Sequence, residues 1–193
     1  MGREFELKFR VSRKTLAQIQ ADLALDWKTW AMETTYYDTP GRELGRLRWT
    51  LRRRMENGVS VCTVKTPASG GGRGEWETEC GEILEAIPEL CKLGCPPELT
   101  YFVADGLEAV CGARFTRQAG ALTLEDCTLE LALDSGVLLG GGREKLLSEL
   151  EVELKSGSEA AAVAYAKTLA AQYGLRPEKK SKYRRALDLA EDR

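Results

Sequence analysis

The sequence predicts an α+β protein built on an eight-stranded antiparallel β-barrel, a tunnel with a charged interior that is flanked by helices. Charged side chains occupy every second position in two segments near opposite ends of the chain: Glu4, Glu6 and Lys8, and then Glu149, Glu151, Glu153 and Lys155. Successive strand side chains point to opposite faces, so each segment has one charged face and one apolar face. The candidate strands are joined mainly by turns of hairpin length, which favours antiparallel pairing, and about eight strands close into a barrel with a small interior.

Further charged stripes predict which face of the sheet is the interior. They consist of Arg46, Arg48, Arg52 and Arg54, then Arg73, Glu75 and Glu77, and later Glu130 and Asp134. If alternate apolar residues such as Leu51 and Val152 faced the interior, the charges would point outward, where the helices need an apolar surface. The sequence therefore predicts apolar side chains outside, beneath helices, and charged side chains inside.

Capping and turn signals delimit the elements in order. A strand is expected at 3–11 and a helix from about Ser12 to Leu25, because Ser12 is a suitable N-cap and apolar residues follow at helical spacing. Turn signals such as Glu56-Asn57-Gly58 and Gly140-Gly141-Gly142 separate the later strands, expected at 32–38, 44–55, 58–66, 73–80, 113–124, 127–134 and 146–155. Helices are expected at 82–91, at 97–111, at 157–173 with the capping box Ser156-x-x-Glu159, and at about 178–190.

Composition excludes several kinds of chemistry. The chain has 30 Asp plus Glu, 28 Lys plus Arg and no histidine, so no Ser-His-Asp or Cys-His site can be built from it. Six cysteines without a CxxC pair predict small buried apolar side chains rather than a zinc site. With 193 residues and 43% hydrophobic composition, we expect one domain over 1–193 with a substantial core.

The net charge limits the kinds of partner that the protein is expected to bind. A net charge of −2 gives no overall attraction to nucleic acid, so a polyanion must be bound by a local concentration of Arg and Lys. We expect a small-molecule partner, no nucleic acid and no membrane, with a homodimer left open. The chain begins directly with a strand, without a signal peptide or an apolar run of membrane length, which predicts a cytoplasmic protein.

The glutamate stripes predict a metal. Glutamates on one face of a strand lie about 7 Å apart and repel one another unless a positive charge lies among them. Carboxylates suit hard cations such as Mg²⁺ or Mn²⁺, and Arg and Lys suit phosphate oxygens.

Several short motifs follow one another in order along the chain. The first motif is the ExExK segment Glu4-Phe5-Glu6-Leu7-Lys8. It is followed by Tyr37-Asp38-Thr39-Pro40, Leu51-Arg52-Arg53-Arg54, Thr63-Val64-Lys65-Thr66-Pro67, Arg73-Gly74-Glu75-Trp76-Glu77, Phe115-Thr116-Arg117, and the segments 130–136 and 149–157. This ordered set resembles the CYTH, or triphosphate tunnel metalloenzyme, superfamily and is most similar to bacterial CYTH proteins of the inorganic triphosphatase type. The resemblance spans the chain and implies an eight-stranded antiparallel tunnel wrapped by helices.

The resemblance also implies roles for individual residues. Glu4, Glu6, Glu151 and Glu153, with Glu149 as a further candidate, match metal-binding glutamates for Mg²⁺ or Mn²⁺. Basic positions that bind the triphosphate are matched by Lys8, Arg52, Arg54, Lys65, Arg117 and Lys182. Arg114 competes with Arg117, because the two have opposite parity on a regular strand and only a bulge would turn both inward. Supporting roles are expected for Glu75, Glu77, Glu130 and Asp134.

The activity that the resemblance implies is metal-dependent hydrolysis of inorganic triphosphate to phosphate and diphosphate, with Glu4, Glu6, Lys8, Glu151 and Glu153 as catalytic residues. Three alternatives share the same tunnel. They are a class IV adenylyl cyclase, which converts ATP to cyclic AMP and diphosphate, a thiamine or nucleoside triphosphatase, and a non-catalytic polyphosphate-binding module.

Overall fold

The computed structural model describes residues 5–67 and 73–191. Its strands are β1 (Glu6–Arg10), β2 (Lys28–Asp38), β3 (Thr50–Glu56), β4 (Val59–Pro67), β5 (Arg73–Glu79), β6 (Glu108–Thr123), β7 (Cys127–Gly140), β8 (Arg143–Gly157) and β9 (Arg176–Pro177). Its helices are α1 (Arg13–Asp22), α2 (Glu43–Arg46), α3 (Ile83–Lys92), α4 (Glu98–Phe102), α5 (Glu159–Tyr173) and α6 (Lys182–Ala190). No helix in these two ranges is long and apolar enough to cross a membrane.

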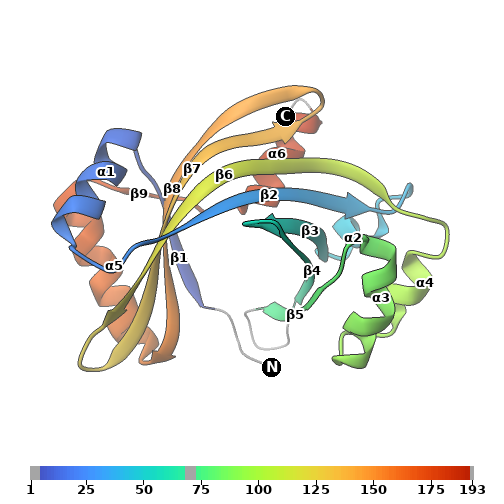
Figure 1. Cartoon of the computed structure of the whole chain (residues 1–193), viewed down its shortest axis with the longest axis horizontal. Coiled ribbons are helices and arrows are strands. Elements are labelled where there is room, and N and C mark those ends of the chain that lie inside the picture. The colour runs from blue at the N-terminus through green and yellow to red at the C-terminus, as the bar shows by residue number, and fades with distance from the viewer. Residues whose placement is uncertain (1–4, 68–72, 192–193) are drawn as a thin grey trace.

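All the strands belong to one sheet, in the order β5-β4-β3-β2-β6-β7-β8-β1-β9. Each described pairing is antiparallel, which confirms the predicted α+β class. The sheet curls strongly (Figure 1), but within 5–67 and 73–191 its outer strands β5 and β9 do not pair with each other. It therefore forms an open, tunnel-like curl of eight long strands, with the two-residue β9 added beside β1.

Helices cover the convex face at its two ends (Figure 1). Helices α1 and α5 pack on one end over apolar side chains of β7 and β8, including Leu131, Leu150 and Val152. Helix α3 packs on the other end over Leu51 and Val64. The predicted inverted polarity is confirmed, because these apolar residues alternate along their strands with charged residues that line the concave side.

Helix α6 lies on the concave side of the sheet, behind β6 and β7 in Figure 1. Its Ala186 is fully buried in a small apolar cluster with Met32, Phe115, Leu138 and Leu147. Ser181 caps the helix by accepting a hydrogen bond from the backbone N–H of Arg184. The helix predicted at 178–190 therefore begins later, at Lys182, and its first turn lies beside the charged face of the sheet.

Two other predicted elements are wrong in part. The strand expected at 44–55 begins only at Thr50, because the Asp38 carboxylate accepts backbone hydrogen bonds from Leu44 and Gly45 and holds 43–46 as helix α2. Arg48 then adopts a left-handed conformation with φ 59°. The helix expected at 97–111 is only α4, because the chain turns at Gly106 (φ 99°) and β6 begins at Glu108 in register with β2.

The last strands and helix α5 differ from expectation at their ends. Strand β7 continues to Gly140 and β8 begins at Arg143, so the two form one long hairpin that turns at the predicted glycines. Ser158, and not Ser156, caps α5, and Gly174 ends this helix in the left-handed conformation.

Candidate active site

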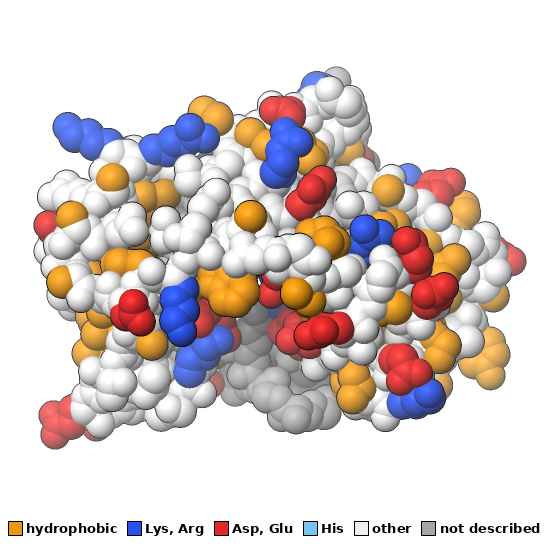
Figure 2. All heavy atoms as spheres, viewed as in Figure 1, with side chains coloured by type: hydrophobic (Ala, Val, Ile, Leu, Met, Phe, Trp, Pro, Cys, Tyr) orange, Lys and Arg blue, Asp and Glu red, His pale blue; other side chains and the backbone are white. Residues whose placement is uncertain are grey.

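A cavity of about 800 Å³ lies on the concave side of the sheet, bounded by all eight long strands and by the start of α6. Among the described residues, eleven basic and six acidic side chains line it. The basic ones are Lys8, Arg52, Arg54, Lys65, Arg73, Arg117, Lys155, Lys179, Lys180, Lys182 and Arg184, and the acidic ones are Glu6, Glu75, Glu77, Glu130, Glu151 and Glu153. On the outer face shown in Figure 2, basic and acidic side chains are interspersed, as expected for a net charge of −2. The surplus of basic groups in the cavity suits a polyanion.

The basic wall of the cavity is formed by Arg52 and Arg54 on β3 and by Lys65 on β4. Lys65 points to the same face because it is the register partner of Thr50, which shares the parity of the two arginines. Lys65 Nζ lies 3.1 Å from a carboxylate oxygen of Glu75, while Arg52 Nη2 lies 3.8 Å from the other. Burial lowers the pKa of Arg54, and the neighbouring Arg52 lowers it further. The Nε atom of Arg52 is buried without a hydrogen-bond partner among the described residues. These crowded cations would gain by contact with an anion.

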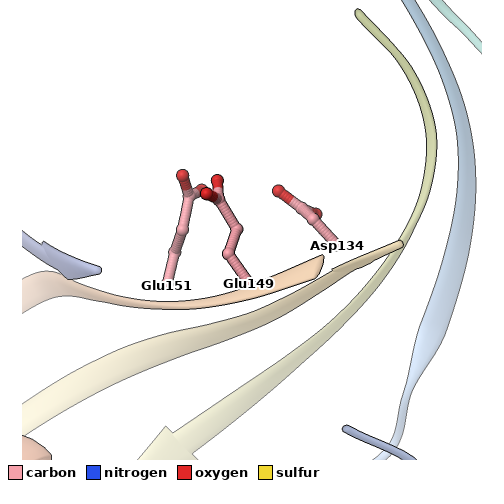
Figure 3. A group of neighbouring side chains, drawn as sticks. All are labelled: Asp134, Glu149 and Glu151. Carbon is pink, nitrogen blue, oxygen red and sulfur yellow. The ribbon is translucent and has the colours of Figure 1, made fainter. Parts of the chain in front are cut away.

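An inner acidic cluster, defined as Asp134, Glu149 and Glu151, lies at the base of the cavity (Figure 3). Asp134 comes from β7 and the two glutamates from β8, and Figure 3 shows all three side chains directed to the same side of the sheet. One oxygen of each carboxylate lies within 4.8 Å of the others. Asp134 and Glu149 are fully buried. Three carboxylates so close together, two of them fully buried, require compensating positive charge.

The compensating charge comes from three basic side chains. Lys182 Nζ lies 2.7 Å from Asp134 Oδ2 and 2.8 Å from Glu151 Oε1, and it also contacts Glu149. Arg117 donates two hydrogen bonds to Asp134, of 2.8 and 2.7 Å, and a third of 2.5 Å to Glu151. Arg185 pairs with Glu149. The inner acidic cluster therefore already has its cations.

These contacts shift the ionisation of the cluster. Burial opposes ionisation of Glu151, but the charges of Lys182 and Arg117 outweigh it and hold the pKa of Glu151 well below its usual range. Burial also opposes the charge of Lys182, yet Asp134 and Glu151 raise its pKa. Burial raises the pKa of Glu149, although Lys182 and Arg185 act in the opposite direction.

The lowered pKa of Glu151 predicts a pH-dependent stability. A carboxylate with a lower pKa in the folded state than in the unfolded state stabilises the fold above its unfolded pKa, and the stabilisation disappears as the pH falls through its folded pKa. We expect Glu151→Gln to lower the free energy of unfolding at pH 7 by about 2–3 kcal/mol. Chemical denaturation between pH 7 and pH 3 measures this. The difference from the unmodified protein should shrink as the pH falls, and a difference that stays constant would contradict the assigned charge.

A second acidic group lies closer to the solvent. The outer acidic row, defined as Glu6, Glu130 and Glu153, crosses β1, β8 and β7, because Glu153 is the register partner of both other glutamates. Their side chains are 27%, 34% and 29% exposed, within reach of the cavity and of water. Like charges directly opposite each other on neighbouring strands repel. Carboxylates that keep access to water suit Mg²⁺ or Mn²⁺, which retain several water ligands. Glu6 pairs with Lys8, and Glu130 and Glu153 pair with Lys155. The outer acidic row, with Glu151 beside it, is thus a candidate donor set for a divalent ion, which would take the place of these two lysines.

The structure brings together most of the residues singled out in the sequence. The cavity is lined by Glu6, Lys8, Arg52, Arg54, Lys65, Glu75, Glu77, Arg117, Glu130, Glu151, Glu153 and Lys182. Asp134 and Glu149 do not line it but lie buried at its base. Glu4 lies outside the described residues.

Arg114 does not join the cavity. Its side chain is 60% exposed and pairs with Glu144, and β6 keeps an unbroken register with β7 from Gly112 to Thr123. Without a bulge, Arg114 and Arg117 must point to opposite faces, so only Arg117 lies inside. The expectation that Arg114 binds the triphosphate is corrected accordingly.

Several lining residues had no assigned role in the sequence. Arg73 and Lys155 share the parity of the charged stripes, so the same alternation could have assigned them. Lys179, Lys180 and Arg184 lie in a loop and the first turn of α6, where strand parity gives no signal. They belong to the cavity because α6 lies on the concave side.

Comparison with known proteins gives consistent matches over most of the chain. The model of the CYTH domain family matches residues 2–187. An inorganic triphosphatase of Haemophilus influenzae is 27% identical over 164 residues, which are 82% of this chain and 47% of the relative, so the chain spans about half the length of this curated relative.

Solved structures agree on the fold. The PH1819 protein of Pyrococcus horikoshii OT3 matches with a TM-score of 0.64 and 21% identity, over 98% of this chain and 99% of that one. A Hippeastrum protein described as a proposed adenylyl cyclase with a dominant triphosphatase activity matches with a TM-score of 0.66 and 18% identity, over 93% of each chain.

Proposed function

Because the chain belongs to the CYTH domain family, we propose that it is a metal-dependent triphosphatase that cleaves inorganic triphosphate to phosphate and diphosphate. The observation that carries this proposal is the division of one cavity into a crowded basic wall and an outer acidic row. The basic wall provides donors for phosphate oxygens, and the acidic row provides oxygen ligands for a divalent ion. The curated triphosphatase relative supports the same activity.

The basic side chains would act by position and charge. Phosphoryl transfer requires little covalent participation by the protein. Its transition state is stabilised by cations held around the phosphate oxygens. Arg52, Arg54 and Lys65 approach the cavity from one wall and Arg117 and Lys182 from its base, so a linear phosphate chain can be contacted from two sides. A divalent ion held by the outer acidic row would add Lewis-acid stabilisation of the phosphate charge.

A carboxylate would orient the attacking water. Glu151 stays ionised at neutral pH, but its lowered pKa makes it a weak base. Glu6, Glu130 and Glu153 are more exposed and lie at the edge of the same cavity, so they are better placed to accept a hydrogen bond from water. The site therefore requires no histidine.

The aromatic side chains of the cavity favour an inorganic substrate. Tyr36 is buried and its ring centroid lies 5.1 Å from that of Tyr183. The Phe115 ring is covered by Lys182 Nζ, 5.2 Å from its centroid, and by the Arg117 guanidinium at 5.8 Å. All three aromatic residues of the described lining thus already pack against other side chains, so they offer a nucleobase or thiamine ring little stacking surface.

Product analysis with three substrates tests the proposal. The purified protein is incubated with Mg²⁺ or Mn²⁺ and with inorganic triphosphate, ATP or thiamine triphosphate, and phosphate, diphosphate and cyclic AMP are resolved. We expect fast cleavage of inorganic triphosphate and slow turnover of the others. Cyclic AMP with diphosphate from ATP would assign an adenylyl cyclase, and tight triphosphate binding without turnover would assign a binding module.

Two neighbouring arginines on β3 provide a matched pair of variants. Arg54 points into the cavity, whereas Arg53 points to the other face and lies 3.7 Å from Glu82. We expect Arg54→Met to raise KM for triphosphate about 10–100-fold, the loss of one charge-assisted hydrogen bond. Arg53→Met should leave KM unchanged within about twofold. Steady-state kinetics of both variants measure this, and equal effects would contradict the inward orientation of Arg54.

A further inference from the structure

Arg185 does not line the cavity, yet it shares one buried carboxylate, that of Glu149, with Lys182. Its guanidinium pairs with Glu149 on one side, and its Nη1 lies 3.7 Å from Glu178 Oε2 on the other. The side chains of both glutamates are almost completely buried, at 0% and 2% exposure, and that of Arg185 is 13% exposed. An arginine between two buried carboxylates fixes the distance between the segments that carry them.

Glu178 in turn is fixed to the edge of the sheet. Its backbone N–H donates a 2.7 Å hydrogen bond to the Lys8 carbonyl, and its carboxylate accepts from Arg10 Nε and from the Lys180 N–H. The adjoining β9 pairs with β1 through Phe9 and Arg10. Arg185 therefore ties α6 both to the β8 wall, through Glu149, and to the β1 edge, through Glu178.

Lys182 and Arg185 share Glu149 as an ion-pair partner. Lys182 and Arg185 are three residues apart on α6, so they lie on one side of the helix. Both pair with Glu149, each with a different oxygen of its carboxylate. Arg185 thus helps to orient the Glu149 carboxylate, and this carboxylate holds the Lys182 ammonium group in place.

We propose that Arg185 is a positioning residue that holds Glu149 and the first turn of α6 so that the Lys182 ammonium faces the cavity and contacts the phosphate chain. The inference rests on the proposed function of the cavity. Without Arg185, Lys182 alone would balance the Glu149 charge within α6, and its ammonium would be drawn away from the cavity. The loss would appear in substrate binding, although Arg185 itself does not line the cavity.

Equilibrium binding separates positioning from a general role in folding. Isothermal titration calorimetry with inorganic triphosphate, in a chelator and without divalent metal so that the ligand is not cleaved, is performed on the unmodified protein and on Arg185→Met, Arg185→Lys and Arg176→Met. Arg176 is an exposed arginine of β9. We expect Kd to rise about tenfold in Arg185→Met, to be largely restored in Arg185→Lys, and to be unchanged in Arg176→Met. A merely structural role would lower the fraction of binding-competent protein, and so the stoichiometry, while leaving Kd unchanged, and this result would overturn the proposal.

A double-mutant cycle tests whether Arg185 acts through Lys182. In a Lys182→Gln background, which keeps hydrogen-bond donors for the inner acidic cluster, we expect Arg185→Met to change Kd by less than twofold. Additive effects of the two substitutions would overturn the proposal. Glu178→Gln, which keeps the size of the side chain, should also raise Kd, by less than Arg185→Met does. An unchanged Kd would contradict the role of Glu178 in holding Arg185.

The titration and the product analysis together distinguish this inference from the proposed function. An unmodified protein that binds triphosphate without cleaving it removes the enzymatic proposal, while the comparison of Kd values still decides on positioning. An unmodified protein that does not bind triphosphate overturns both.

Discussion

Lys182→Met is expected to lower the free energy of unfolding by about 3–5 kcal/mol, the usual cost of removing one partner from a buried ion pair. The Lys182 ammonium contacts all three carboxylates of the inner acidic cluster, and its side chain is only 10% exposed. After the substitution, Arg117 and Arg185 remain as the cations that face three carboxylates. The residual negative charge is buried and cannot be hydrated without opening the base of the cavity.

Chemical denaturation of Lys182→Met measures this loss, and Lys92→Met is the matched control. Lys92 forms an exposed ion pair with Glu89, at 71% side-chain exposure, so its removal should change stability by less than about 0.5 kcal/mol. Millimolar Mg²⁺ or Mn²⁺ should stabilise Lys182→Met more than the unmodified protein, because the three carboxylates that lose the Lys182 charge have oxygens within 4.8 Å of one another. A variant as stable as the unmodified protein would contradict the assigned role of Lys182.

Removal of a carboxylate from the outer acidic row is expected to have the second large effect. We expect Glu6→Gln and Glu153→Gln each to lower kcat/KM for triphosphate by about 10²–10³-fold, since metal stabilisation of transition-state charge contributes several kcal/mol. The amide keeps the size of the side chain but loses the charge that a divalent ion requires. The dependence of rate on Mg²⁺ concentration should shift to higher concentration in both variants.

The control for this prediction is Glu79→Gln. Glu79 is an exposed glutamate at the end of β5 that does not line the cavity. Its substitution should leave both kcat/KM and the Mg²⁺ dependence unchanged. Full activity in both single variants, Glu6→Gln and Glu153→Gln, would contradict a catalytic role of the outer acidic row.

The alternation of charged and apolar residues predicted much of the sheet and of the site. Parity along a strand decides which face a side chain occupies, so Glu151, Arg52 and Arg54 could be placed inside without knowledge of the fold. The same rule decides between Arg114 and Arg117 once the register of β6 is known to be unbroken. The two-residue alternation in the sequence was therefore sufficient to assign these side chains to one face of the sheet.

Contacts between distant segments could not be predicted in this way. Asp38 holds 43–46 as a helix through its side chain, and this overrides the strand-like alternation of Leu44 to Arg48. The burial of Glu149 depends on α6, which returns from the end of the chain to place Lys182 and Arg185 beside it. Periodicity within a segment contains no information on such a return, so the ion pairs of the inner acidic cluster became apparent only from the structure.

The most direct test of the central claim is a ³¹P NMR time course of inorganic triphosphate with the unmodified protein and Mg²⁺. The account predicts that the triphosphate signals disappear while phosphate and diphosphate appear in equal amounts, and that Glu6→Gln slows this conversion by about 10²–10³-fold. Triphosphate that remains intact with the unmodified protein, or that is cleaved equally fast by Glu6→Gln, would contradict it.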